Sequence, residues 1–127
     1  MVKMVQQPPN SSICGHCCVA MATGHDVEEV IQLIGHRHST RTKELHLALR
    51  NLGYHTEEKL TRVKVNFYTQ FPTHCILKIT YDERPNTGHW VYYEHGLIYC
   101  PGGDIRVWSD YVKFGDRGRI TSYLKIE

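Results

Sequence analysis

Cys14 is the side chain of this sequence best placed to act as a nucleophile. It opens an apolar stretch that ends at Gly24, and Ser12 lies two positions before it. A serine there is typical of a helix N-cap and a glycine of the left-handed residue that ends a helix, so the stretch predicts a helix that begins at Cys14. The positive end of the helix dipole favours the thiolate, the nucleophilic form of cysteine. We therefore expect Cys14 to be catalytic.

A cysteine nucleophile needs an imidazole base within hydrogen-bond reach. Among the nine histidines, His89 is the best candidate, because it follows Gly88 at the start of a strand-like segment. Adjacent side chains of a strand point to opposite faces of the sheet. Trp90 is therefore expected to lie behind the imidazole, where it shields the site from water and borders the substrate.

Acyl transfer also needs hydrogen-bond donors for the oxyanion. Gln7 lies shortly before Cys14, and its side-chain amide is a suitable donor beside the Cys14 backbone N–H. Pro8 and Pro9 make the path between them hard to predict, so Gln6 is the alternative donor.

Two kinds of pattern divide the chain into an N-terminal helical half and a C-terminal strand half. Helices are predicted, from spacings of three and four residues and from closing glycines, over residues 14–23, 26–34 and 42–52. Strands are predicted, from alternating polarity, over residues 63–67, 74–79, 90–93, 97–99, 105–108 and 120–126. Residues 81–88 are predicted to form a loop, and Asp26 to cap the second helix. This order predicts one α+β domain over residues 1–127, with the helices packed on an antiparallel sheet.

The composition excludes several classes of protein. The chain has 127 residues and a net charge of +2 without a basic block, so we expect no nucleic-acid partner. No apolar run approaches the ~20 residues of a membrane span, and the N-terminus lacks a signal-peptide core. The five cysteines are an odd number and clustered, which argues against a disulfide framework. We expect a cytoplasmic protein that needs no cofactor and binds no membrane.

Short motifs of known order support the same chemistry. Within residues 6–103 they are Gln7 ahead of Cys14-Gly15, Val19-Ala20-Met21, Gly88-His89-Trp90-Val91 and Tyr99-Cys100-Pro101, with helical segments at residues 26–30 and 40–45. In this the chain resembles the papain-like C39 peptidases, most of all the small stand-alone members from bacteria and phages. The resemblance implies a papain-like fold, a Cys14 nucleophile, a His89 base and a Gln7 oxyanion donor. It also implies a peptide or protein substrate, since peptidase relatives remove leader peptides, often after a double glycine.

The chain departs from that family at Cys100. Family members usually carry an aspartate there, which orients the histidine, and a neutral thiol is a weaker acceptor than a carboxylate. Asp104 is close enough in sequence to take over this role. Otherwise the site works as a dyad, or the domain is catalytically weak or inactive and binds a partner protein, such as a component of a host cell.

Two other functions compete for the same residues. Cys14 and Cys17 form a Cys-x-x-Cys motif of the thioredoxin type, although two prolines precede it and three helical segments follow. Cys14 and Cys17, or Cys14 with His89 and Cys100, are also candidate zinc ligands, although the sequence lacks a second paired ligand set. Neither alternative displaces the cysteine hydrolase as the leading hypothesis.

Overall fold

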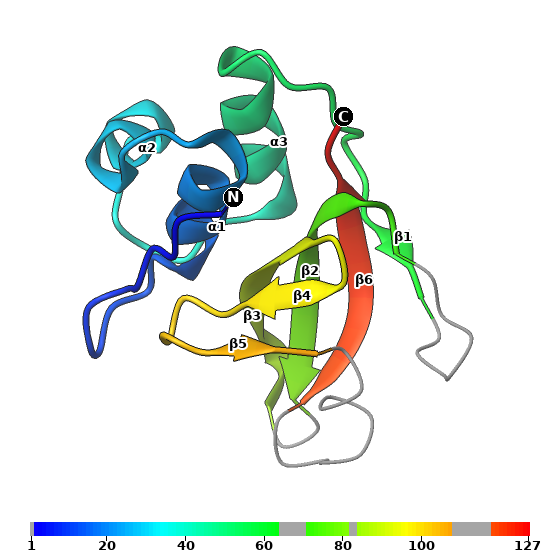
Figure 1. Cartoon of the computed structure of the whole chain (residues 1–127). Coiled ribbons are helices and arrows are strands. Elements are labelled where there is room, and N and C mark those ends of the chain that lie inside the picture. The colour runs from blue at the N-terminus through cyan, green and yellow to red at the C-terminus, as the bar shows by residue number, and fades with distance from the viewer. Residues whose placement is uncertain (1, 64–70, 82–83, 108–117) are drawn as a thin grey trace.

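Three helices lie on one side of a curved antiparallel sheet. The computed structural model describes residues 2–63, 71–81, 84–107 and 118–127, and Figure 1 shows the helices grouped beside the sheet with β4 and β5 at its near edge. This architecture confirms the predicted α+β class with the helices first. Parts of two predicted strands, around Val65 and at Trp108, lie outside the described residues.

The three helices are α1 (Cys14–Thr23), α2 (Val27–Ile34) and α3 (Thr42–Asn51). The first two end as the sequence predicts, because Gly24 and Gly35 take left-handed conformations with φ of 75° and 94° and donate their N–H groups to Ala20 and Ile31. Among the described residues, no helix is both long and apolar enough to cross a membrane.

Of the two predicted N-terminal caps, Ser12 is wrong and Asp26 lies at the predicted position. Ile13 rather than Ser12 occupies the N-cap position of α1, and Asp26 occupies that of α2, but neither Ile13 nor Asp26 forms a side-chain cap hydrogen bond. Ile13 is only 6% exposed and packs with Cys17 and Ile31. Burial of this apolar side chain therefore determines where α1 begins, and the Ser12 hydroxyl is left at the surface.

All pairs of neighbouring strands in the sheet are antiparallel. In chain order the strands are β1 (Thr61–Arg62), β2 (His74–Tyr81), β3 (Arg84–Glu94), β4 (Leu97–Tyr99), β5 (Ile105–Arg106) and β6 (Arg119–Lys125). In space their order is β1-β6-β2-β3-β4-β5. The long strands β2 and β3 thus lie at the centre, and β3 has α1 packed against it.

The loop predicted over residues 81–88 is wrong over most of its length. β2 continues to Tyr81 and β3 begins at Arg84, with a register shift between Thr80 and Tyr81. Pairing of Arg84 and Gly88 with β2 holds both ends of this segment in the sheet, and it prevails over the turn preferences of the local residues. His89 consequently lies well inside β3 rather than at its start.

The two faces of the sheet carry separate apolar clusters. Trp90 and Tyr92 face the helices and pack with residues such as Leu49, whereas Val91 belongs to the cluster on the opposite face. This alternation agrees with the predicted faces of β3. His89 shares the face of Val91, so its side chain starts from the side of the sheet away from the helices.

The contact between α3 and the sheet yields a stability prediction. Leu49 is fully buried and Leu47, on the same helix, is 47% exposed. Leu49→Ala is expected to lower the free energy of unfolding by about 2–5 kcal/mol, because it leaves a cavity in the core. Leu47→Ala, the matched control, is expected to change it by less than about 0.5 kcal/mol. Chemical denaturation measures both, and equal losses would contradict the packing described here.

Candidate active site

The amino end of α1 presents the Cys14 sulfur to the backbone of β3. The backbone N–H groups of Trp90, Gly15 and Cys14 itself lie near this sulfur and act to lower the thiol pKa. Burial is the larger effect, however, and it raises the pKa of Cys14 above the ordinary value for a thiol. Cys14 is therefore a protonated thiol at neutral pH that has donors in place to receive a developing negative charge.

His89 contacts Cys100, the residue at the family's aspartate position. The Nε2 atom of His89 lies 3.3 Å from the Cys100 sulfur. Burial lowers the pKa of the His89 imidazole and raises the pKa of the Cys100 thiol. The pair is thus a hydrogen bond between neutral groups, and it lacks the charge by which a carboxylate would raise the basicity of the imidazole.

Cys14, His89 and Cys100 meet at one junction of α1, β3 and the turn after β4. The Cys14 sulfur lies near the backbone N–H of Trp90, the residue next to His89, and the charge of a Cys100 thiolate would raise the pKa of Cys14. Within the described part of the chain, His89 Nε2 bonds to Cys100 and neither ring nitrogen bonds to Cys14. In this structure the His89 ring is therefore paired with Cys100 and not with Cys14.

Gln7 lies beside the same turn but uses its side chain locally. Its backbone N–H donates to Pro101 O at 2.7 Å. Its side-chain Nε2 donates to Ser11 O at 2.9 Å, and its buried Oε1 has no hydrogen-bond partner. Gln7 therefore needs to release Ser11 before its amide can bind an oxyanion. Gln6, the alternative donor, packs against Gly103.

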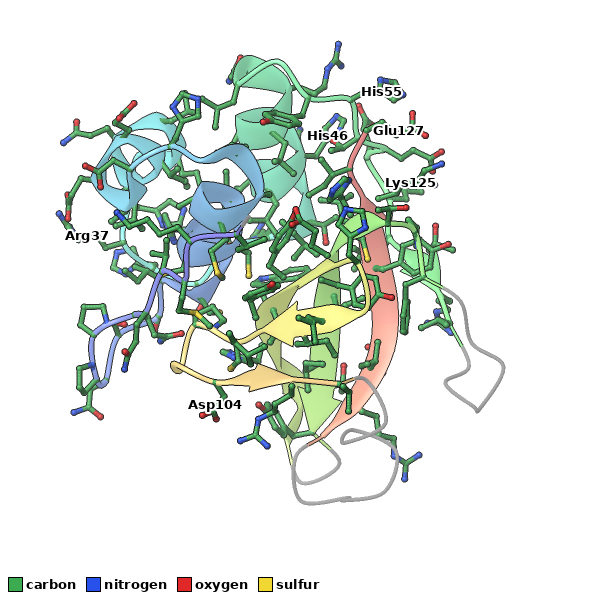
Figure 2. All side chains as sticks on the ribbon, in the orientation of Figure 1. Arg37, His46, His55, Asp104, Lys125 and Glu127 are labelled. Carbon is green, nitrogen blue, oxygen red and sulfur yellow. The ribbon has the colours of Figure 1, made fainter. Side chains whose placement is uncertain are left out.

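Asp104 does not contact the imidazole. Its carboxylate accepts a hydrogen bond of 2.6 Å from Arg106, and it is an exposed side chain. Figure 2 shows Asp104 at the outer edge of the sheet, next to β5. Its backbone carbonyl accepts the N–H of Cys100 at 2.8 Å, so Asp104 shapes the turn that carries Cys100.

A groove of about 370 Å³ opens beside Cys14. It is lined by Cys14, Trp90, Gly88, Lys78 and the residues before and at the start of α3, namely Ser39, Thr40, Arg41 and Thr42. Trp90 is 6% exposed and Lys78 Nζ lies 5.9 Å from the centre of its ring. The charged side chains of this lining are Arg41 and Lys78, so the groove favours an anionic occupant.

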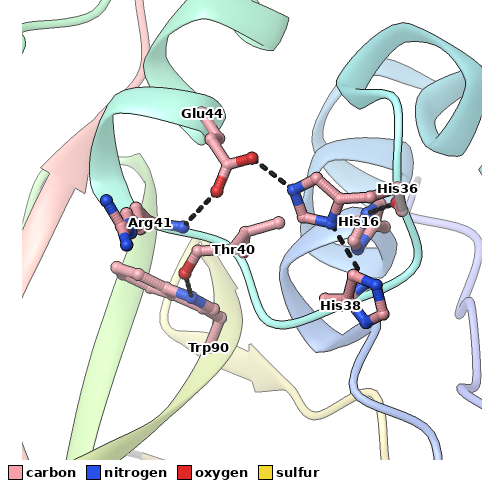
Figure 3. Close-up of polar contacts among 7 residues, drawn as sticks. All are labelled: His16, His36, His38, Thr40, Arg41, Glu44 and Trp90. Atoms are coloured by element: carbon pink, nitrogen blue, oxygen red, sulfur yellow. Dashed lines mark hydrogen bonds and ion pairs between the residues drawn. The ribbon is translucent and has the colours of Figure 1, made fainter.

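Hydrogen bonds fix the wall of the groove that precedes α3 (Figure 3). Glu44 accepts the Arg41 N–H at 2.9 Å and also bonds to the ring of His36. Thr40 O accepts the Trp90 indole N–H at 3.3 Å. The sequence did not predict this groove. Lys78, a charged residue within an apolar strand that lines the groove, was the available signal for it.

The competing functions fit this geometry less well. A thioredoxin fold needs a strand before the Cys-x-x-Cys motif, and residues 2–13 contain none. Cys17 is fully buried, and burial raises its pKa to about 12. As for zinc, the ligand atoms of Cys14, His89 and Cys100 do not all lie within 4.8 Å of one another. Among the described residues only His74, Glu94 and His95 do.

When the chain was compared with known proteins, no protein-family model and no curated protein matched it.

Differences in burial predict which cysteines react in the folded protein. Cys14 and Cys100 are partly exposed, whereas Cys17, Cys18 and Cys75 are fully buried. Iodoacetamide is expected to modify only the first two until the protein unfolds. Because burial raises its pKa, Cys14 should react increasingly fast as the pH rises past ~8.5, where an ordinary thiol titrates.

Peptide mass spectrometry over a pH series measures these rates, with the protein in denaturant as the control in which all five cysteines react. If Cys14 already reached its maximal rate at pH 6, the neutral thiol described here would be wrong.

Proposed function

We propose that this protein is a cysteine hydrolase of the papain-like type that acts on peptide or isopeptide bonds. The observation that carries the proposal is the position of the Cys14 sulfur. It lies at the amino end of α1, near the backbone N–H of Trp90, the residue next to His89 on β3. This N–H comes from another element of the fold, and it is placed to stabilise the negative charge that a nucleophilic sulfur develops.

His89 acts in this mechanism as a general base on a neutral thiol. It takes the Cys14 proton as the sulfur attacks the carbonyl carbon, and a tetrahedral oxyanion forms. The Cys14 backbone N–H and the Gln7 amide, once turned from Ser11, stabilise that oxyanion. Protonated His89 then gives its proton to the leaving nitrogen, and a thioester remains on Cys14. A water molecule that His89 deprotonates hydrolyses the thioester and restores the free thiol.

The groove beside Cys14 indicates the kind of substrate. Arg41 and Lys78 line it, and no acidic side chain does among the described residues. An aspartate or glutamate next to the scissile bond would gain a charge-assisted contact there, whereas a lysine would be repelled. We therefore infer that the substrate segment is acidic.

A second candidate function is the binding of a partner protein by a site with little or no activity. The favouring observation is that His89 contacts the Cys100 thiol, where a carboxylate would hold the ring and raise its basicity. The two functions differ in what His89 contributes. In a hydrolase His89 accelerates reaction at Cys14, and in an inactive binder it does not.

A peptide carrying an electrophilic vinyl sulfone and an aspartate side chain separates these functions. The hydrolase predicts covalent labelling of Cys14 that slows by about 100-fold in His89→Ala, because the general base is lost. The matched control, His55→Ala, removes an exposed histidine outside the site and should label like the wild type. A lysine-containing probe should label more slowly than the aspartate probe. Equal labelling of the wild type and His89→Ala would support the binder.

Restoring the carboxylate should raise the reactivity of the site. In Cys100→Asp the negative charge beside His89 Nε2 raises the pKa of the imidazole, which burial lowers in the wild type. The acid limb of probe labelling, which lies below ~6.5 in the wild type, is then expected to move to higher pH, and labelling at pH 7.5 to increase by roughly 10-fold for one unit of pKa.

Cys100→Ser, which is neutral and of similar size, is the control and should move neither quantity. Thermal unfolding checks that both variants fold. An unchanged acid limb in folded Cys100→Asp would show that position 100 does not control His89.

A further inference from the structure

Two histidines and a glutamate converge at the other end of the central strands. His74 begins β2 and Glu94 ends β3, and these two residues are cross-strand partners. His95 follows directly in the turn to β4. Glu94 lies five residues beyond His89 on the same strand, which is roughly 17 Å at ~3.4 Å per residue. This cluster is therefore separate from the Cys14 site.

The side chains of the cluster face one another. His74 Nε2 lies 3.4 Å from Glu94 Oε1. The rings of His74 and His95 are 5.2 Å apart between centroids and nearly perpendicular, at 82°. One ligand atom from each of the three residues lies within 4.8 Å of the other two.

The backbone that carries the cluster is held from several sides. His95 and Gly96 form the two-residue turn between β3 and β4 with φ of 48° and 88°. Asparagine, aspartate or glycine is usual at the first of these positions, and histidine is another residue that accepts a positive φ. The His95 N–H donates to Thr73 O at 3.1 Å, and His74 O accepts the N–H of Ile126 at 3.1 Å.

The hydroxyl group of a neighbouring tyrosine orients the Glu94 carboxylate. Tyr92, which is 1% exposed, donates its hydroxyl to Glu94 Oε1 at 2.8 Å. The bond takes one lone pair of Oε1 and leaves the other for a metal ion. Hydrogen bonds of this kind fix the carboxylate ligands of metal sites.

We propose that His74, Glu94 and His95 bind a divalent transition metal ion of the zinc class. Two imidazole nitrogens and one carboxylate oxygen suit Zn²⁺ and exclude the oxygen-rich coordination of Ca²⁺ and Mg²⁺. Tetrahedral Zn²⁺ with bonds of ~2.0–2.1 Å separates neighbouring ligand atoms by roughly 3.4 Å. His74 and Glu94 already have this separation, and the exposed His95 side chain reaches it by rotating. Water completes the coordination.

Titration of the whole chain with ZnCl₂, followed by calorimetry, tests the proposal. The wild type is expected to take up one equivalent. Glu94→Gln keeps the shape and the Tyr92 contact, and His95→Asn keeps the left-handed turn. Each is expected to weaken Zn²⁺ binding by at least about 10-fold. His55→Asn, at an exposed histidine outside the cluster, is the matched control and should bind like the wild type.

Cysteine binding is the rival explanation for any uptake of metal. Cys14→Ser and Cys100→Ser should leave Zn²⁺ affinity unchanged, and Co²⁺ should give visible d–d bands without sulfur-to-metal charge transfer. Circular dichroism of the metal-free variants checks their folding. The proposal is overturned if the wild type takes up no Zn²⁺, if Glu94→Gln and His95→Asn bind as tightly as the wild type, or if a cysteine substitution removes binding.

Discussion

The contact between Trp90 and the elements around it holds the candidate site together. The indole ring is buried between the sheet and the helices, and its N–H bonds to Thr40 O in the segment before α3. The backbone N–H of the same residue lies near the Cys14 sulfur at the start of α1. One residue of β3 thus fixes two helices relative to the strand that carries His89, and burial of the ring provides the driving force.

The same burial determines the charge state of the site. Removal from water raises the pKa of the Cys14 and Cys100 thiols and lowers the pKa of the His89 imidazole. All three groups are therefore neutral at physiological pH. A buried carboxylate at position 100 would favour an ion pair, whereas the thiol found there favours proton transfer during the reaction. The proposed general-base mechanism therefore follows from the burial of the site together with the neutral residue at position 100.

The sequence contained enough information for the helices and for the order of the elements. Closing glycines such as Gly24 and the apolar spacing of Val30, Ile31 and Leu49 act locally, so they can be read without a structure. The start of α1 at Cys14 was predicted correctly, but its N-cap residue was not, because burial of Ile13 depends on a partner from another helix. The extent of β3 could not be predicted from the sequence either, since pairing with β2 prevails over its turn-forming residues.

For the site, spacing and motif order identified Cys14, His89 and Cys100, which the fold brings to one junction. The roles of Gln7 and Asp104 depend on side-chain rotamers and nearby competitors. Ser11 engages Gln7 and Arg106 engages Asp104, and neither contact follows from spacing. The cluster of His74, Glu94 and His95 depends on strand register, which becomes visible only once β2 and β3 are paired.

The distance between residues 14 and 89 is the quantity on which this account depends most directly. In a Cys100→Ser background, His89→Cys places a second thiol opposite Cys14, and dibromobimane becomes fluorescent when it bridges two neighbouring sulfur atoms. The account predicts a bridged, fluorescent product for His89→Cys and none for Leu47→Cys, which places the second thiol at an exposed position of α3. If both thiols of the His89→Cys protein reacted singly and no bridge formed, the juxtaposition of Cys14 and His89 would be contradicted.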